Sequence, residues 1–344
     1  MKKTLITCAA LALMLTACHD NVSDNVKSDM VTDAVAEAVT TRNCGAMEVL
    51  NTQLALNPAL ADKMASVENH YTEYFNKAMA NKGKPNNNGN GGSNGGGDTP
   101  PADNLGTITI PVVVHVLYNT TQENISDAQI NSQIAVLNKD FSATNADLNG
   151  VPTEFSSVVA NSDIQFSLAQ VIRKQTSKAS WGTNDAMKSS SSGGSDVVQP
   201  DKYLNIWVCN IGGGILGYAQ FPGGNSATDG VVISPQFFGS QGYVQVPFDK
   251  GRTATHEIGH YLNLRHIWGD GKCRQDDYVT DTPSSDRPNY GCPSYPTYHC
   301  NSNDMTMNYM DYVDDECMYM FTEGQKYRMR SLFTAGGVRE SMLQ

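Results

Sequence analysis

The chain has 344 residues, of which 40% are hydrophobic and 17% are charged, and its formal net charge at pH 7 is −11. This length leaves room for one sizeable hydrophobic core and for additional segments outside it. The excess of negative charge argues against nucleic acid or an acidic membrane surface as the partner.

The N-terminus predicts export from the cell. Two lysines precede an apolar run over residues 5–17, which is too short to span a bilayer in the mature protein. The run ends in Leu-Thr-Ala-Cys, and this ending resembles the lipobox of bacterial lipoproteins. We therefore expect residues 1–17 to be removed as a lipoprotein signal peptide and Cys18 to be lipidated. The alternative is an ordinary secretory signal in which this cysteine is incidental.

The stretch after the signal divides by composition into two parts. Residues 18–84 carry weak helical patterning, for example over residues 30–39 and 58–80, and we interpret them as a small propeptide. Residues 85–104 are rich in Asn, Gly and Pro and have almost nothing to bury, which predicts a flexible linker that proteases can reach. A cut in the linker, or at a lysine just before it, would free residues 105–344 from the propeptide and the lipid anchor.

Residues 105–344 predict one domain that mixes helices and strands. In chain order we expect a buried strand at 107–118, a helix that starts behind Ser126, strands at 164–172, 204–209 and 230–234, and a final helix at 322–332. Ser126 is the predicted N-cap of the first helix. The pattern is typical of an α/β or α+β fold.

Residues 256–266 read His-Glu-Ile-Gly-His-Tyr-Leu-Asn-Leu-Arg-His and predict a metal site. On a helix, His256 and His260 project from one face, so that their ring nitrogens can share a Zn²⁺ ion at about 2.0–2.1 Å. Glu257 would stay outside the metal's ligands but within reach of its water. His266 completes a three-histidine site only if the helix ends and the chain turns back. Three neutral ligands leave a fourth position open, which is typical of catalytic zinc.

The alternative for this segment is a chance cluster of histidines. The chain has seven histidines, and three of them fall within these eleven residues. The spacing of all three agrees with a zinc site, so we favour that interpretation.

The segment resembles the extended zinc signature of the metzincin metalloproteases. That signature usually has a glycine three residues after the second histidine, where this chain has Asn263. Asparagine is the residue other than glycine that best tolerates the left-handed conformation needed there. Residues 308–312, Asn-Tyr-Met-Asp-Tyr, are similar to the methionine turn of the metzincins, in which Met310 would be a packing platform beneath the metal.

The flanking sequence narrows the resemblance to one family. Residues 265–270 and 281–283 most resemble the pappalysins and their bacterial cytophagalysin-like members, and the likeness covers roughly residues 107–335. It implies a twisted mixed sheet, a backing helix, a zinc-binding active-site helix and an irregular, disulfide-stapled C-terminal subdomain. It also implies a secreted zinc-dependent endopeptidase that is made as a latent zymogen.

The resemblance also implies roles and partners. Glu257 would be the general base, and Tyr312 matches a tyrosine that contacts zinc in several metzincins and would stabilise the oxyanion. The alternative for Tyr312 is an ordinary packed aromatic residue. We expect a monomer that acts on protein or peptide substrates, does not bind nucleic acid, and meets the membrane only through Cys18. This places it in the cell envelope, at the outer membrane or cell surface, with release of the catalytic domain after processing.

Cysteine content agrees with an oxidising compartment. Four of the eight cysteines follow the zinc segment closely: Cys273, Cys292, Cys300 and Cys317. Four cysteines allow three pairings, and the sequence alone does not choose among them. The family resemblance implies the pairs Cys273–Cys300 and Cys292–Cys317. Cys209 lies in an apolar strand, and we expect it to be a buried free thiol.

Cys44 lies far upstream in Arg42-Asn43-Cys44-Gly45, which is similar to the cysteine-switch motif of metalloprotease propeptides. A thiolate is a good zinc ligand and can occupy the open fourth position in place of water. Arg42 would favour the thiolate and could bind a carboxylate in the active-site cleft. The alternative is an unpaired cysteine in a poorly structured leader.

Two acidic segments give further expectations. Residues 276–282 gather carboxylates and hydroxyls of the kind that Ca²⁺ prefers, and family members carry calcium at such a loop, so we expect structural calcium with Asp277, Thr280 and Thr282 as ligands. A solvated acidic turn is the alternative. The acids after the methionine turn lie where the family forms the pocket for the residue after the cut. We expect Glu316 to line this pocket and to select Arg or Lys.

Two other classes of function agree less well with these residues. A zinc-stabilised surface-binding lipoprotein would need no catalytic groups, yet Glu257 and an open ligand position are both predicted. A metallohydrolase that acts on a non-peptide bond would not need the methionine turn. The sequence therefore favours a zinc endopeptidase over both.

Overall fold

The computed structural model describes residues 39–82 and 103–343. The predicted signal peptide, Cys18, most of the predicted linker and all but the last residue of the helix expected at 30–39 lie outside the described residues. Within the described ranges, no helix is both long and apolar enough to cross a membrane.

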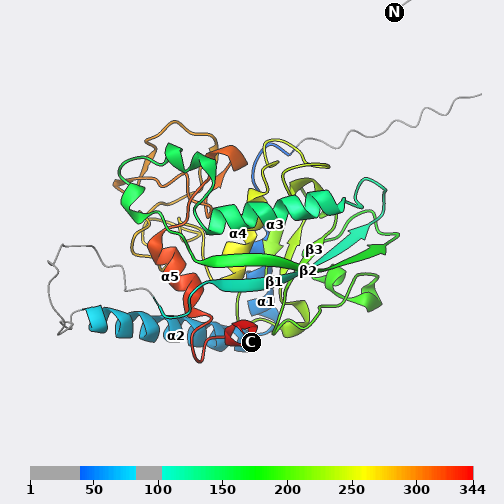
Figure 1. Ribbon diagram of the computed structural model, residues 1–344, viewed down its shortest axis with the longest axis horizontal. Coiled ribbons are helices and arrows are strands. Elements are labelled where there is room, and N and C mark those ends of the chain that lie inside the picture. The colour runs from blue at the N-terminus through cyan, green and yellow to red at the C-terminus, as the bar shows by residue number, and fades with distance from the viewer. Residues whose placement is uncertain (1–38, 83–102, 344) are drawn as a thin grey trace, which may run out of the picture. The chain divides into compact units, whose positions relative to one another are not determined.

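A five-stranded mixed sheet forms the centre of residues 103–343, which we call the catalytic domain, and its strand order is β2-β1-β3-β5-β4 (Figure 1). The strands are β1 (Ile108–Tyr118), β2 (Ile164–Gln175), β3 (Leu204–Val208), β4 (Gly217–Ala219) and β5 (Val231–Ile233). Four strands are parallel, and β4 alone in this sheet runs antiparallel, at the edge beside β5. Because helices cover both faces, the central strands β1 and β3 are almost continuously apolar and buried.

Two helices cover one face of the sheet. α3 (Asp127–Phe141) begins behind Ser126, whose side chain accepts a hydrogen bond from the backbone N–H of Gln129 at 3.1 Å, as the sequence predicts. α4 (Arg252–Tyr261) contacts α3, β4 and β5, and its residues Ala254 and Ile258 join the same apolar core as the α3 side chains. α4 is therefore held firmly between the sheet and the segments that follow it.

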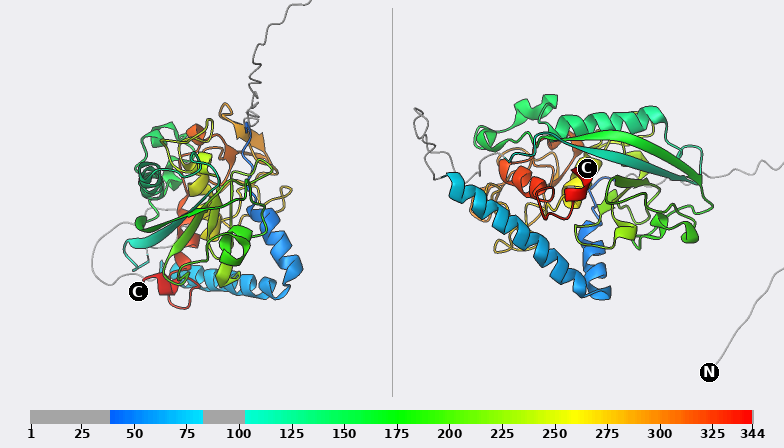
Figure 2. Two further views of the ribbon diagram at one scale, coloured as in Figure 1. Left: turned by 90° about the vertical axis from the view of Figure 1, so that its right-hand side faces the viewer. Right: turned by 60° about the horizontal axis from the view of Figure 1, so that its bottom comes forward.

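Two further helices belong to the segment before the predicted linker. α1 (Ala46–Leu56) packs on the face of the sheet opposite α3, where its apolar residues join a second core with Trp207 and Tyr218 (Figure 2). α2 (Ala59–Lys82) contacts α5 (Glu323–Ser331), which begins with a capping box formed by Thr322 and Gln325. We call residues 39–82 the prosegment, and the whole of it belongs to the same compact unit as the sheet.

The region between α4 and α5 has little regular structure, as predicted. It contains short strand pairs, β6 (Tyr290–Gly291) with β9 (Tyr312–Val313) and β7 (Tyr298–His299) with β8 (Ser302–Asn303). Two disulfides, Cys273–Cys300 and Cys292–Cys317, join its loops. Cys209 is a buried free thiol.

Asp103 contacts the rest of the catalytic domain although it lies two residues before the predicted start of that domain at residue 105. The carboxylate of Asp103 accepts hydrogen bonds from Arg330, at 2.6 Å from Nε and 2.5 Å from Nη2. Asp103 is therefore bound to α5, although the sequence predicts that it belongs to the flexible linker.

Candidate active site

α4 carries His256 and His260 one turn apart and ends where the sequence predicts. The backbone N–H of Asn263 bonds to the carbonyl of His260 at 2.9 Å, and that of Leu264 bonds to the carbonyl of Gly259 at 2.9 Å. Asn263 has a φ of 74°, in the left-handed region that a helix-terminating turn requires. The turn sends the chain back beneath α4 and brings His266 to the other two histidines.

The three imidazoles converge on one point. The ring centroids of His256 and His260 lie 4.8 Å apart, and those of His260 and His266 lie 4.6 Å apart. The two Nε2 atoms of His260 and His266 approach to 3.1 Å. This close approach of ring nitrogens is expected for ligands that share one small cation.

Each imidazole is fixed in one orientation by an acceptor at Nδ1. His256 Nδ1 donates to the carbonyl of Tyr309 at 2.7 Å, and His260 Nδ1 donates to the carbonyl of Leu264 at 2.8 Å. His266 Nδ1 instead faces a carboxylate, Asp270 Oδ1, at 2.5 Å. These partners leave all three Nε2 atoms free to bind a metal.

The electrostatics also suit a metal. Burial lowers the pKa of His256, and it lowers the pKa of His260 to about 3, so both rings are neutral, as ligation requires. Among the described residues, His256 Nε2 is buried and has no hydrogen-bond partner. An orphaned buried nitrogen beside two others fits a tetrahedral zinc ion with three histidine ligands.

Met310 lies directly against α4, beneath the histidines. A Cβ atom added at Gly259 would lie 2.4 Å from Met310 Sδ, so only glycine allows this approach. Met310 is fully buried. Gly259 of the histidine motif and Met310 of the methionine turn are therefore in direct contact.

Glu257 points toward the edge strand β4. A Cβ atom added at Gly217 would lie 3.0 Å from Glu257 Cγ, so the strand leaves just enough room for this side chain. Burial raises the pKa of Glu257 to about 8, although Cys44 and Arg42 act in the opposite direction. Glu257 is therefore a buried carboxylate that can take up a proton near neutral pH in the latent chain.

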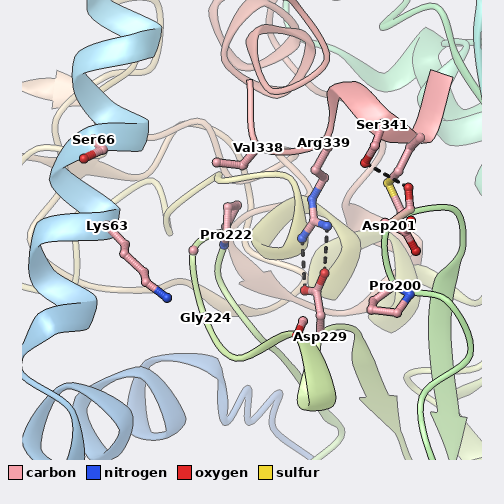
Figure 3. Close-up of a pocket in the computed structure, with 13 residues that line it drawn as sticks. Lys63, Ser66, Pro200, Asp201, Pro222, Gly224, Asp229, Val338, Arg339 and Ser341 are labelled. Carbon is pink, nitrogen blue, oxygen red and sulfur yellow. Dashed lines mark hydrogen bonds and ion pairs between the residues drawn. The ribbon is translucent and has the colours of Figure 1, made fainter. Parts of the chain in front are cut away.

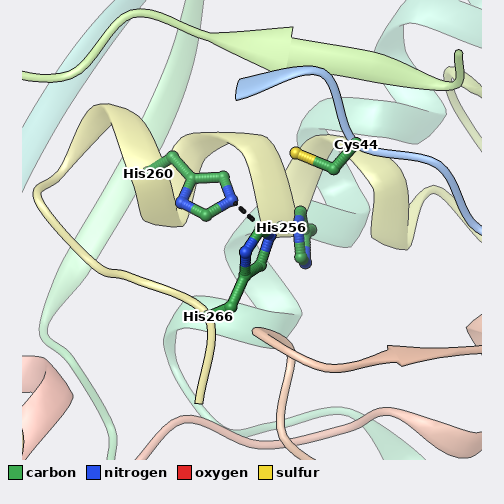
Figure 4. Close-up of side chains that lie close together, drawn as sticks. All are labelled: Cys44, His256, His260 and His266. Carbon is green, nitrogen blue, oxygen red and sulfur yellow. Dashed lines mark hydrogen bonds between the residues drawn. The ribbon is translucent and has the colours of Figure 1, made fainter. Parts of the chain in front are cut away.

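Cys44 enters the site from the prosegment. Figure 4 shows its sulfur directed toward the imidazoles, and its Sγ and one ring nitrogen from each histidine all lie within 4.8 Å of one another. Its Sγ is also 3.4 Å from Glu257 Oε2. Burial and the neighbouring Glu257 raise the pKa of the Cys44 thiol, whereas a bound dication would favour the thiolate.

The backbone around Cys44 extends the sheet. Gly45 N–H donates to the carbonyl of Gly217 at 2.9 Å, and Leu216 N–H donates to the carbonyl of Asn43 at 3.0 Å. The pairing is parallel to β4. The prosegment therefore covers the free edge of the sheet beside the histidines.

Arg42 is buried two residues before Cys44, in a pocket beside α4. Its Nη2 lies 2.6 Å from Asp315 Oδ1, its Nη1 donates to Thr253 Oγ1 at 3.3 Å, and its Nε donates to the carbonyl of Val313 at 3.2 Å. The guanidinium also lies 4.9 Å from the ring centre of Phe248. Arg42 therefore pairs with a buried carboxylate close to the start of α4.

The carboxylate in this pocket belongs to Asp315 and not to Glu316. Asp315 is fully buried, and its Oδ2 accepts the backbone N–H groups of Lys250 at 2.8 Å and Arg252 at 3.1 Å, where α4 begins. The side chain of Glu316 is 63% exposed and has Lys250 Nζ 3.6 Å away. The sequence indicates an acidic pocket here but does not indicate which acid faces inward.

Tyr312 lies next to the histidines on β9. Its ring centroid is 4.9 Å from that of His266 and 5.7 Å from that of His256. Its hydroxyl donates to the carbonyl of Cys44 at 3.5 Å. The Tyr312 ring therefore lies beside the histidines, and a backbone carbonyl of the prosegment accepts the hydrogen bond from its hydroxyl.

The expected calcium loop is folded around Asp277. The buried carboxylate accepts the backbone N–H of Val279 at 3.0 Å and the hydroxyl of Thr282 at 2.7 Å, whereas Thr280 is exposed. Burial raises the pKa of Asp277 to about 7. The loop thus has one buried carboxylate with two internal donors.

Comparison with known proteins decides the family. Residues 189–334 match the Peptidase M43 family, described as pregnancy-associated plasma protein-A. Extracellular metalloprotease 1 of Coccidioides posadasii is 34% identical over 244 residues, which are 67% of this chain and 79% of that protein. An extracellular metalloprotease of Arthroderma benhamiae is 35% identical over 254 residues, 68% of this chain and 76% of the relative. The chain belongs to the pappalysin family of metzincin metalloproteases.

Solved structures of pappalysins agree with the fold. Mature mirolysin of Tannerella forsythia in complex with a cleaved peptide is 48% identical and has a TM-score of 0.68, covering 71% of this chain and 97% of that chain. A mutant of Tannerella forsythia promirolysin is 41% identical and has a TM-score of 0.75, covering 88% of this chain and 97% of that chain. The promirolysin structure thus covers more of this chain than the mature mirolysin structure does.

The family and the site together establish the activity. The protein is a secreted zinc metalloendopeptidase with a three-histidine metal site, it acts on proteins or peptides, and its chain is the zymogen form. The predicted metzincin fold, with its active-site helix and its two C-terminal disulfides, is confirmed.

Proposed function

We propose that His256, His260 and His266 hold the zinc ion through Nε2, that Glu257 is the general base and that Tyr312 stabilises the oxyanion. The free Nε2 atoms and the fixed Nδ1 partners of the histidines support this assignment. A zinc ion bound there would supply a Lewis acid and would acidify the attacking water.

The protein groups then divide the remaining work. Glu257 takes the proton from the attacking water and passes it to the nitrogen of the leaving amine. The Tyr312 hydroxyl, once the prosegment carbonyl has left, is free to donate a hydrogen bond to the oxyanion. Met310 supports α4 from below and takes no part in the chemistry.

The single observation that carries the proposal of latency is the position of Cys44. Its sulfur lies where the fourth zinc ligand would be, between the three histidines and Glu257. A thiolate there would displace the attacking water, and Glu257 would then have no water from which to accept a proton. We propose that Cys44 is the zymogen switch.

The Arg42 pocket supports a substrate preference. A buried Asp315, a threonine hydroxyl and a backbone carbonyl together match a guanidinium. We propose that the mature enzyme binds Arg or Lys of the substrate in this pocket, directly after the scissile bond. Asp315 then takes the role expected for Glu316.

Three further assignments remain proposals. Cys18 would be the lipid anchor of an envelope-bound precursor, with residues 18–84 as propeptide and 85–104 as the linker that is cut to release the catalytic domain. The mature enzyme would be monomeric. A structural calcium ion would bind at Asp277, where a cation would compensate the buried carboxylate; of the two other expected ligands, Thr282 already contacts it and Thr280 does not.

The catalytic assignment is tested with a denatured protein substrate. We expect the activated enzyme to cut it, a zinc chelator to abolish cutting, and Glu257→Ala to lower kcat by at least about a thousandfold while zinc stays bound. Glu316→Gln, which changes an exposed carboxylate, is the matched control. Cutting by Glu257→Ala at the control's rate would overturn the role of Glu257.

A further inference from the structure

A second contact between the prosegment and the catalytic domain lies away from the histidines. Glu68 on α2 accepts hydrogen bonds from both terminal nitrogens of Arg328, at 2.8 Å from Nη1 and 2.5 Å from Nη2. The Arg328 side chain is 0% exposed and that of Glu68 is 27% exposed. This paired arrangement of a carboxylate on a guanidinium is the strongest geometry that the two groups can form.

Asn263 completes the same site. Its Nδ2 donates to Glu68 Oε1 at 3.2 Å, and its carbonyl accepts a hydrogen bond from Arg328 Nε at 2.7 Å. Three donors from the catalytic domain therefore converge on one prosegment carboxylate. The metzincin signature usually has glycine at this position, which would keep the left-handed turn but would have no amide to offer.

The rest of α2 makes uneven contact. Near Glu68 the contact is direct: Tyr71 lies 5.1 Å from the Arg328 guanidinium, and His70 Nε2 lies 3.1 Å from the carbonyl of Ser331. One turn earlier, Lys63 and Ser66 border a cavity of about 440 Å³ that separates α2 from the Arg339–Asp229 ion pair (Figure 3). α2 also packs through Leu60 and Val67, which are buried, and through Tyr74 and Phe75, whose rings lie against Tyr327, so Glu68 supplies the ion pair within a longer apolar contact.

The location of this contact matters for activation. The predicted linker follows α2, so a cut between residues 82 and 103 leaves Glu68, Arg42 and Cys44 on the same fragment. Among the described residues, Glu68 provides the only carboxylate that pairs with Arg328. Departure of the fragment would remove this counter-charge and both hydrogen bonds that Glu68 accepts from Arg328, which opposes dissociation.

We propose that Arg328 and Asn263 form a carboxylate-binding site of the catalytic domain, that its ligand is Glu68, and that this site keeps the cut prosegment on the enzyme. Cleavage of the linker is then not sufficient for activity. The fragment must still dissociate or be digested. This site holds α2 and is separate from the histidines. Arg42 and Cys44, in contrast, contact Asp315 and the histidine cluster.

The test uses the full chain with Glu257→Ala, which prevents self-digestion, and with one recognition sequence for an unrelated protease inserted in the linker. After the cut, the dissociation rate of the fluorescently labelled prosegment is measured. We expect Glu68→Gln to speed dissociation by at least about 30-fold, because it removes the charge from one partner of a largely buried pair, a change that acts mainly on the dissociation rate. Glu73→Gln, which removes an exposed charge from the same helix, is the control and should change the rate less than twofold.

The receptor side is tested with mild variants, and melting temperatures before the cut confirm that each is folded. Arg328→Lys keeps the charge but loses the paired hydrogen bonds, and Asn263→Gly keeps the turn but loses the amide, so each should speed dissociation by about fivefold or more. Equal rates for Glu68→Gln and Glu73→Gln would overturn the proposal. So would immediate loss of the unmodified prosegment on cutting. Neither readout depends on peptidase activity.

Discussion

At the scale of single residues, the prosegment inserts one arginine and one cysteine into the catalytic domain. Arg42 pairs with the buried Asp315, and Cys44 lies beside the histidines and Glu257. The sequence motifs predict both residues, and they predict the three histidines. They do not separate Asp315 from Glu316, because a short 3₁₀ helix over Asp315–Cys317 turns one acid inward and the next outward.

The assignment of Asp315 leads to a prediction about specificity. Asp315→Asn in the activated enzyme should lower kcat/KM for substrates with Arg after the scissile bond by about 30-fold or more, since a buried charge pair would be lost while the acceptor at the start of α4 is kept. Peptides with an uncharged residue at that position should be affected far less. Kinetics on the two matched peptide sets measure the difference, and Glu316→Gln serves as control. A larger loss for Glu316→Gln than for Asp315→Asn would restore the original expectation.

At the scale of elements, long periodic segments are predictable and short ones are not. β1, α3 and α5 lie where the sequence patterns place them, because burial and capping act within one segment. The three-residue strand β4 and the helix α1 are not apparent in the sequence. β4 is defined by its pairing with β5, and α1 by the sheet face on which it packs, so neither has a sufficient signal of its own.

The contact between α4 and the methionine turn leads to a prediction at this scale. Gly259→Ala should lower the free energy of unfolding by about 1–3 kcal/mol, because the new Cβ atom would overlap Met310 Sδ. In a Met310→Ala background the same change should cost much less, since the overlapping atom is gone. Chemical denaturation of the four proteins of this cycle measures the coupling. Equal costs in both backgrounds would show that Met310 does not limit the approach of α4.

At the scale of the whole molecule, the described part of the prosegment makes two ion pairs with the catalytic domain, in addition to the apolar packing of α1 on the sheet. Residues 42–45 lie beside the three histidines, at Asp315 and along the edge of the sheet, and α2 contacts α5 through Glu68. The sequence predicts the first attachment through the cysteine motif. It does not predict the second, because the contact joins residues 260 positions apart and only the fold brings them together.

The most direct test of the Cys44 switch is X-ray absorption at the zinc edge of the full chain, with Cys44→Ala as the comparison. We expect three nitrogen ligands and one sulfur ligand in the unmodified zymogen, at about 2.0–2.1 Å and 2.3 Å. In Cys44→Ala we expect a light atom in place of the sulfur, with the three nitrogens unchanged. A spectrum of the unmodified zymogen without sulfur at the zinc would contradict the proposed switch.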